Sequence, residues 1–312
     1  MERDIDLVIP MVFPEDPAWQ RDYASRRGSA AAAVRDVRFR SWGTEHLLVM
    51  CCLRYMPWLR RIVLLLASGS QVRPWMADLM ESQSTADAPR LDVVLHRDFM
   101  PVEVLPTFNV LTIEMFLHRI PGLSERFIYS NDDFFPLSPL EPEDFFRGGL
   151  PCQHFDERPF PSSPNVFQLF VKNGLDMVAA DFGRRFPRTW LRGGHSMQPM
   201  LLSTVREVCR LHAGRISGSF TFERSARNLN QYIFPFWQHL SGRYADHVPP
   251  RRYVGPRTPT GDIAAILRDP GCGIVCLNDN EGIADWEARA GIVRREIAAK
   301  LGAGGSPPDA CP

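Results

Sequence analysis

The sequence of 312 residues has almost no lysine, no net charge and no long apolar run. Its 36 basic residues balance 36 acidic ones, whereas a nonspecific nucleic-acid binder would be expected to carry a basic excess. Lys172 and Lys300 are the only lysines, so arginine supplies nearly all the positive charge. No apolar stretch approaches the roughly 20 residues of a membrane helix, and the opening MERDIDLVIP is not patterned as a secretory signal.

Cysteine is present without the regularity of a disulfide framework. The seven cysteines are odd in number and follow no repeated spacing in a chain of this length. Cys272 and Cys276 are four residues apart, but no second pair at zinc-site spacing accompanies them. Because the composition is 45% hydrophobic and 23% charged, we expect an ordinary globular protein in the reducing cytoplasm.

Short apolar runs alternate with helical patterns through the first 136 residues. Val110, Ile113, Leu117 and Ile120 follow the three-four spacing of a helix. Strands are predicted at 5–13, 60–68, 90–100 and 126–130, helices at 45–56, 73–82 and 109–120, a polar turn at 14–19, and a helix-prone stretch at 26–40. This alternation predicts an α/β fold with an open, largely parallel sheet flanked by helices.

The character of the sequence changes after residue 136. Residues 134–165 are rich in proline and aromatics, which predicts an ordered excursion, and helices are predicted at 196–212 and 229–242. A short strand at 273–279 and an amphipathic helix at 286–301 close the chain. We therefore predict one domain over 1–302, with an α/β half at 1–136, a mostly helical half at 137–302 that completes the site, and a disordered tail at 303–312.

Two adjacent carboxylates follow a predicted strand directly in RFIYSNDDFFP, residues 126–136. In open α/β sheets, ligands bind beyond the carboxyl ends of strands, at a break in strand order. Paired carboxylates there suit Mg²⁺, which proteins usually hold with one or two carboxylates plus substrate phosphates. The alternative is a turn in which Asp132 and Asp133 only cap the backbone.

Three further side chains could carry chemistry. Glu114 lies on the apolar stripe of its helix and needs a partner, which His118 could supply at i,i+4 without any function. His195 follows two glycines at the start of a predicted helix and suits proton transfer, although most lone histidines are only satisfied polar residues. Arg224 fits either a phosphate clamp or an ordinary surface arginine. None of the three identifies an activity alone.

The order of the sequence blocks resembles that of the Stealth family. The blocks are RFRSWGTEHLL (38–48), LRYMPWLRRIVLLLASGSQVRPWM (53–76), LPTFNVLTIEMFLHRIPGLSERFIYSNDDFFP (105–136), HSMQPMLL (195–202) and CLNDN (276–280). The third block is long and specific. The family comprises bacterial capsule and exopolysaccharide hexose-1-phosphate transferases and includes the α/β subunit of eukaryotic N-acetylglucosamine-1-phosphotransferase.

The resemblance implies an activity, a cofactor and a place in the cell. A hexose-1-phosphate, such as N-acetylhexosamine-1-phosphate, would pass from a UDP-sugar to a hydroxyl of a polysaccharide or oligosaccharide acceptor, with release of UMP. The cofactor would be a divalent cation, Mg²⁺ or Mn²⁺, and residues 1–136 would bind the nucleotide sugar. The protein would act in the cytoplasm, or peripherally at the inner face of the membrane beside the capsule machinery.

The resemblance also assigns site residues, position by position. The family's catalytic set falls on Glu114, Asp133, His195 and Arg224, and the expected metal ligands are Asp132 and Asp133. The residues expected to bind substrate are Asn109, Arg119, Asn131, Asn278 and Asp279.

Two family positions are occupied differently in this chain. Phe13 stands where the family has an aspartate, with Asp16 the nearest carboxylate, and Ser41 and Trp42 replace an Asp-Asn pair. These changes leave the choice of donor and acceptor open. They also leave two alternatives: a metal-dependent glycosyltransferase, which would release UDP, and a catalytically inactive nucleotide-sugar-binding homologue.

Overall fold

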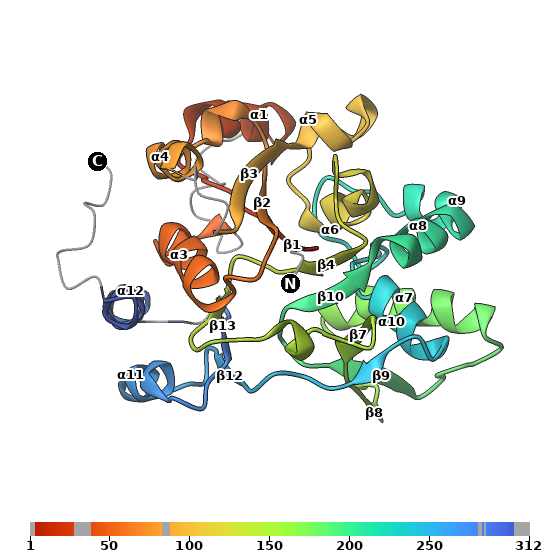
Figure 1. The fold of residues 1–312 in the computed structure, drawn as a ribbon. Helices are drawn as coiled ribbons and strands as arrows, with labels where there is room; N and C mark the ends of the chain where they lie inside the picture. Colours follow the sequence, from red (N-terminus) through yellow and green to blue (C-terminus); the bar gives the residue numbers. More distant parts are fainter. Residues whose placement is uncertain (1–3, 28–38, 83–87, 280–282, 284, 303–312) are drawn as a thin grey trace.

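The central sheet has five strands in the order β10-β4-β1-β2-β3 (Figure 1). The computed structural model describes residues 4–27, 39–82, 88–279, 283 and 285–302. Parallel strands are β1 (Ile5–Pro10), β2 (Arg61–Leu66), β3 (Arg90–Leu95) and β4 (Arg126–Tyr129), and β10 (Gln198–Leu201) pairs antiparallel with β4. The predicted α/β class with a largely parallel sheet is confirmed.

Apolar clusters cover both faces of this sheet. Leu7 and Ile9 of β1 join one cluster and Val8 joins the other, because successive side chains of a strand point to opposite faces. The first cluster contains residues of α3 (Glu45–Tyr55), α4 (Pro74–Ser82), α11 (Thr260–Arg268) and α12 (Trp286–Lys300). The second contains residues of α5 (His96–Phe99), α6 (Val110–Glu114), α7 (Val166–Asp181), α8 (Leu202–Leu211), α9 (Ala213–Ser217) and α10 (Ile233–Leu240). The strands are therefore buried on both sides, which explains their continuous apolar sequences.

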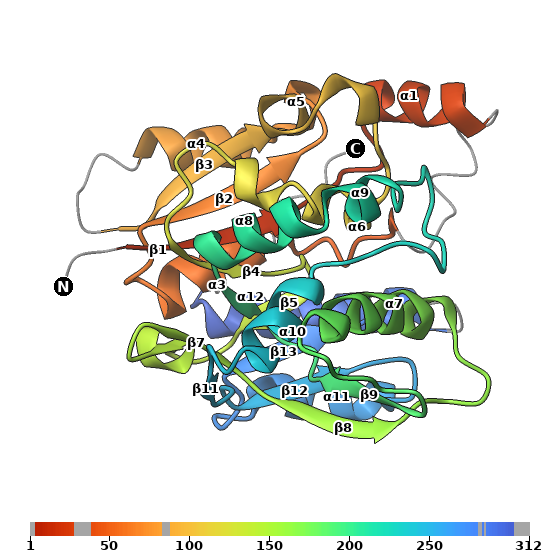
Figure 2. The ribbon, with the colours of Figure 1, turned by 90° about the vertical axis from the view of Figure 1, so that its right-hand side faces the viewer.

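The second half of the chain contains more strand than predicted (Figure 2). The small sheets consist of β5 (Phe134–Pro136) with β13 (Ile274–Leu277) and β12 (Arg251–Val254), β6 (Phe146–Arg147) with β7 (Leu150–Gln153) and β11 (Ala245–Asp246), and β8 (Phe155–Pro159) with β9 (Thr189–Gly193). Helices still make up the larger part of the regular structure in residues 137–302. The strand predicted at 273–279 contains β13, whereas the other strands of these small sheets are too short for local sequence patterns to reveal them.

Two predicted boundaries were wrong. The helix predicted from residue 196 begins only at Leu202, because residues 198–201 add β10 to the edge of the central sheet. The predicted turn at 14–19 instead starts α1 (Pro17–Arg27), where Asp16 accepts hydrogen bonds from the backbone N–H groups of Ala18 (3.1 Å) and Trp19 (3.4 Å). Most of the helix-prone stretch 26–40 and the predicted tail 303–312 lie outside the described residues.

The remaining short helices are 3₁₀ turns: η2 (Gly69–Gln71), η3 (Val102–Val104), η4 (Leu117–Arg119) and η5 (Pro142–Asp144). Within the described ranges, no helix has the length and apolar character to cross a membrane.

The strand order reverses at β1. The chain places β2 and β3 on one side of β1 and then β4 on the other, so the carboxyl ends of β1 and β4 flank a topological switch point. Asn131, Asp132 and Asp133 follow β4 directly. The predicted break in strand order beside the two aspartates is therefore present.

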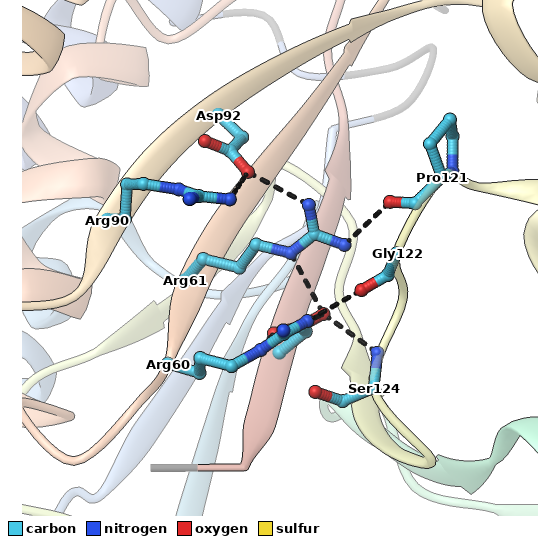
Figure 3. A network of polar contacts seen from close by, with 8 residues as sticks. Arg60, Arg61, Arg90, Asp92, Pro121, Gly122 and Ser124 are labelled. Atoms are coloured by element: carbon cyan, nitrogen blue, oxygen red, sulfur yellow. Dashed lines mark hydrogen bonds and ion pairs between the residues drawn. The ribbon is translucent and has the colours of Figure 1, made fainter.

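The opposite edge of the sheet is held by a buried ionic network (Figure 3). Asp6 on β1 is fully buried and accepts two hydrogen bonds from Arg60 (2.8 and 2.6 Å) and one from Arg61 Nε (3.0 Å). It also accepts the backbone N–H of Ser124 (3.0 Å), while Arg61 Nη1 donates to Asp92 on β3 (2.8 Å). The network thus ties β1, β2, β3 and the segment before β4 together at their amino ends.

Replacing Asp6 with alanine is expected to lower the free energy of unfolding by about 3–5 kcal/mol, because Arg61, only 5% exposed, would lose its buried counter-charge. The exposed pair of Asp4 and Arg126 supplies a matched control, for which Asp4→Ala should cost at most about 1 kcal/mol. Urea unfolding of both variants measures the difference. Equal losses would contradict a special role for the buried network.

Candidate active site

Asp132 and Asp133 form the turn that leads from the central sheet into β5. The carbonyl oxygen of Asp133 accepts the backbone N–H of Leu277 (2.8 Å), and its Oδ2 accepts the thiol of Cys276 (3.5 Å). Its Oδ1 is buried without a hydrogen-bond partner in the described part of the chain. Each of the two aspartate side chains also hydrogen-bonds to its own backbone, and this contact lowers its pKa.

Negative charge at this turn is only partly compensated. Removal from bulk water raises the pKa of Asp132 to about 7, with the carboxylates of Asp133 and Glu45 acting in the same direction. Desolvation likewise raises the pKa of Asp133 to about 6, against the opposing effects of Cys276 and Arg224. Protein surrounds the Asp132 carboxylate, yet the residue keeps part of its surface open to solvent. The turn therefore offers negative charge that a ligand can reach.

This arrangement fits a divalent cation held jointly by protein and substrate. Asp133 contributes a buried oxygen without a partner among the described residues, and Asp132 contributes a second carboxylate on a residue that is partly open to solvent. Within the same residues no group of three or more His, Cys, Asp and Glu side chains could hold a metal ion. Substrate oxygens would have to supply further ligands, which is the usual mode of Mg²⁺ binding.

Glu114 lies at the end of α6 and is 3% exposed. Its Oε1 accepts the hydroxyl of Tyr129 (3.0 Å) and its Oε2 accepts the backbone N–H of Gln231 (2.8 Å). Burial raises its pKa to about 7, although these hydrogen bonds and Arg224 act to lower it. The expected pairing with His118 was wrong, because α6 ends at Glu114 and His118 lies in the separate turn η4.

Arg224 joins the carboxylates into one electrostatic cluster. Its positive charge lowers the pKa of Glu114, Asp132 and Asp133 alike. The residue itself lies in the exposed loop between α9 and α10. The structure thus brings together four of the residues that the sequence singled out, although they are separated by up to 110 positions.

Asn109 holds the loop that carries Arg224. Its Oδ1 accepts the backbone N–H of Leu111 (3.2 Å) as the N-cap of α6, and its Nδ2 donates to the carbonyl oxygens of Thr221 (3.1 Å) and Glu223 (3.2 Å). Asn109 is 1% exposed. The structure therefore gives it a positioning role in place of the predicted substrate contact.

His195 reaches the same edge of the sheet through β10. Gln198, the first residue of β10, pairs with Tyr129 at the carboxyl end of β4. Because the two strands are antiparallel, the residues just before β10 extend past that end, where Asp132 and Asp133 lie. His195 is exposed there rather than inside the predicted helix.

Aromatic rings and two arginines surround the imidazole of His195. Its ring lies 5.2 Å from that of Tyr253 and 6.3 Å from that of Phe167, measured between centroids. Burial against its neighbours lowers the pKa of His195, and the charges of Arg192 and Arg251 lower it further. A neutral imidazole is the form that accepts a proton. No hydrogen bond between His195 and Glu114 is present among the described contacts.

Three other residues predicted to bind substrate lie near the aspartates. Asn131 and Asn278 are half-buried, one before Asp132 and the other at the end of β13. Asp279 follows, but both of its carboxylate oxygens accept hydrogen bonds from Arg40 (2.8 and 2.5 Å). Asn131 and Asn278 thus remain candidates for substrate contact, whereas Asp279 ties residue 40 to the end of β13.

Arg119 lies elsewhere. Pro121 follows it by two residues, and the carbonyl oxygen of Pro121 accepts a hydrogen bond from Arg61 (2.9 Å). Arg61 is the first residue of β2. Arg119 is thus close to the amino edge of the sheet, opposite the aspartates. Its predicted substrate contact is not supported by this position, because α6 and η4 carry the chain from one edge of the sheet to the other.

The residues that depart from the family's pattern have structural roles. Phe13 is buried beneath the guanidinium of Arg73, which lies 4.3 Å from the ring centroid. Asp16 caps α1 and accepts the hydroxyl of Ser70 (2.6 Å), so its oxygens are already engaged. Trp42 is buried and donates to the carbonyl oxygen of Leu277 (3.0 Å).

The sequence did not point to several residues that contact this site. Cys276 touches Asp133 across 143 positions, and Gln231 reaches Glu114 across 117. The apolar pattern of residues 274–277 predicts a buried strand, but it does not predict which strand pairs with it. Tyr129 could have been noticed in the sequence, since it lies shortly before the two aspartates.

Replacing Glu114 with glutamine is expected to remove a pH-dependent loss of stability. The pKa of Glu114 rises from an ordinary 4.5 to about 7 on folding, so the native state binds the proton more tightly than the unfolded state. The wild type should therefore lose up to about 3 kcal/mol as pH rises from about 4.5 through 7. Urea unfolding of both proteins at pH 4, 6 and 8 tests this. A difference between them that is constant with pH would contradict it.

Comparison with known proteins identifies relatives along the whole chain. Residues 38–152 match the family model described as Stealth protein CR2, conserved region 2. Capsular polysaccharide phosphotransferase WcwK of Streptococcus pneumoniae is 28% identical over 91% of this chain and 92% of its own. Exopolysaccharide phosphotransferase cps2G of Lactiplantibacillus plantarum is 25% identical over 96% of this chain and 94% of its own.

Higher identity is confined to part of the chain. Capsular polysaccharide phosphotransferase cps1A of Actinobacillus pleuropneumoniae is 36% identical over 47% of this chain and 39% of its own. Among solved structures, the galactosyltransferase LgtC aligns over 97% of this chain and 98% of its own at 11% identity and a TM-score of 0.45. At that TM-score the likeness assigns neither fold nor activity. The family match and the phosphotransferase relatives confirm the predicted resemblance to the Stealth family and, with it, the prediction of a transferase enzyme.

Proposed function

We propose that this protein transfers a hexose-1-phosphate from a UDP-sugar to a glycan hydroxyl and releases UMP, in capsular or exopolysaccharide synthesis. The observation that carries the proposal is the cluster of Glu114, Asp132, Asp133 and Arg224 at the switch point of the sheet. The names of its relatives, capsular and exopolysaccharide phosphotransferases, support it. The reaction would take place in the cytoplasm or at the inner face of the membrane.

The donor diphosphate carries negative charge into a region that is already negative. Asp132 and Asp133 would hold Mg²⁺ or Mn²⁺, which when bound neutralises the diphosphate and the departing UMP. Arg224 would donate to two oxygens of the transferred phosphoryl group, since a guanidinium matches two phosphate oxygens at once. Glu114 is too buried to reach the donor, so it would position the site by holding Gln231 and balancing Arg224.

The acceptor side needs a base. In the proposed step the acceptor oxygen bonds to the sugar-linked phosphorus, the bond between the two phosphoryl groups breaks, and UMP leaves with the bridging oxygen. His195 would take the proton of the acceptor hydroxyl, for which its lowered pKa keeps the imidazole in the neutral form.

Identification of the nucleotide product tests the proposal directly. The protein would be incubated with UDP-sugars, a glycan acceptor and Mg²⁺ or Mn²⁺, and the nucleotides separated by chromatography. We expect UMP. Release of UDP would identify a glycosyltransferase that breaks the bond between sugar and phosphate. Tight binding of UDP-sugar without nucleotide release, across several acceptors, would identify an inactive binding protein.

Two variants separate the proposed roles in the site. Asp133→Asn should lower turnover by about 10³-fold or more and weaken Mn²⁺ binding, because a bound metal supplies several kcal/mol of charge stabilisation. His195→Ala should lower turnover by about 10² to 10⁴-fold and leave Mn²⁺ binding unchanged. Turnover and electron paramagnetic resonance of Mn²⁺ measure the two effects. Near-normal turnover of either variant would refute its assignment.

A further inference from the structure

A small cavity lies against the backbone segment that carries His195. Its volume is about 20 Å³, and the residues used in this argument that line it are Gly194, Ser196 and Arg251. A water molecule needs about 10–15 Å³ of such space, so the cavity accepts a small polar group. The chemistry proposed above gives none of these residues a contact with the substrate.

Arg251 lies in this cavity without a counter-charge. A Cβ at Gly194 would lie 2.2 Å from Arg251 Nη2, so the guanidinium rests directly on the backbone next to His195 and needs glycine there. Arg251 is half-buried, and burial lowers its pKa. Within the described residues its side chain has no hydrogen bond or ion pair, and Asp156 acts on it only from a distance. A partly buried cation of this kind is costly unless a ligand pairs with it.

Ser196 supplies a second, independent indication. It is 5% exposed and lines the same cavity, and its Oγ has no hydrogen-bond partner among the described residues. Buried hydroxyl groups are normally hydrogen-bonded, so an isolated one facing a cavity points to a polar ligand.

The balance of charge around the cavity favours an anion. The carboxylate of Asp144, which also lines it, already contacts His247 Nε2 (3.3 Å). Arg192 on β9 is exposed and, like Arg251, acts on His195 through its positive charge. The uncompensated charge beside His195 is therefore positive, the reverse of the situation at the two aspartates.

We infer that Arg251 and Ser196 form a subsite for a phosphodiester group of the acceptor glycan. The inference rests on the proposed function, in which His195 receives the proton of the acceptor hydroxyl, so that these residues lie on the acceptor side. In the proposed function, Arg224 and the two aspartates bind the donor diphosphate, so Arg251 and Ser196 are not needed for the donor. Because each transfer creates a phosphodiester, an acceptor that has already received one unit carries this anion, and the subsite selects such chains for extension.

Equilibrium binding of two matched probes tests the subsite without any turnover. One probe is a disaccharide joined by a phosphodiester, and the other is a disaccharide of the same sugars joined by a glycosidic bond. The wild type should bind the first about 10- to 100-fold more tightly, the range expected for hydrogen bonds to a charged group. Arg251→Gln should abolish the preference without changing the affinity for the second probe, and Arg251→Lys should retain part of it.

Arg252→Gln is the matched control. Arg252 is the next residue of β12, points to the opposite face and pairs with Asp269 (2.8 Å), so the preference should survive its substitution. In transfer assays Arg251→Gln should raise KM about tenfold for the phosphodiester acceptor, with little change in KM for the UDP-sugar. Circular dichroism confirms that each variant is folded.

Three results would overturn the inference. They are equal binding of the two probes by the wild type, a preference that survives in Arg251→Gln, and Arg251-dependent binding of a glucuronate disaccharide with none of the phosphodiester. If UMP is released while the preference is absent, only the subsite fails. If the preference depends on Arg251 while no UMP is released, the proposed reaction fails and the subsite stands.

Discussion

The geometry of the site depends on a buried carboxylate at the far edge of the sheet. Asp6 binds Arg60 and Arg61 and thereby fixes the starts of β1 and β2 against the segment that enters β4. Parallel strands run from this edge to the other, so fixing where they start also fixes where they end. A slip of one residue would turn every side chain to the opposite face, and Asp133 would no longer lie beside Cys276.

Charged side chains are compensated at the amino ends of the strands but only partly at their carboxyl ends. At the amino edge, guanidinium groups surround Asp6 and Asp92, and the network is complete within the protein. At the carboxyl edge, Asp132 and Asp133 keep raised pKa values because the charge of Arg224 offsets their desolvation only in part. Arg251 shows the same imbalance with the opposite sign. Uncompensated charges of this kind destabilise the folded protein. They lie where a bound ligand of opposite charge would compensate them.

The sequence predicted the central sheet and one half of the site. Continuous apolar runs identified β1 to β4, and position at a strand end was enough to single out Asp132 and Asp133. His195 and Arg224 were weak candidates until the family resemblance singled them out, because a lone histidine or arginine has no local signature. β10 and the small strands other than β13 were not predicted, since residues 198–201 become a strand only by pairing with β4. The role of Asn109 was equally hidden, because its hydrogen bonds reach a loop 112 positions away.

Asp133 and Cys276 are in contact although 143 positions separate them, and between them the chain makes a long excursion that rejoins the central sheet only through β10. Almost everything that faces the acceptor in the proposed reaction lies on this long excursion, whereas the aspartates and Glu114 belong to the conserved region that ends at residue 152. The two halves of the reaction are thus encoded in separate stretches of the gene. Apart from Arg224, the residues proposed to handle the phosphate thus lie before the excursion, and substitutions within the excursion can change the acceptor side while Glu114, Asp132 and Asp133 stay the same.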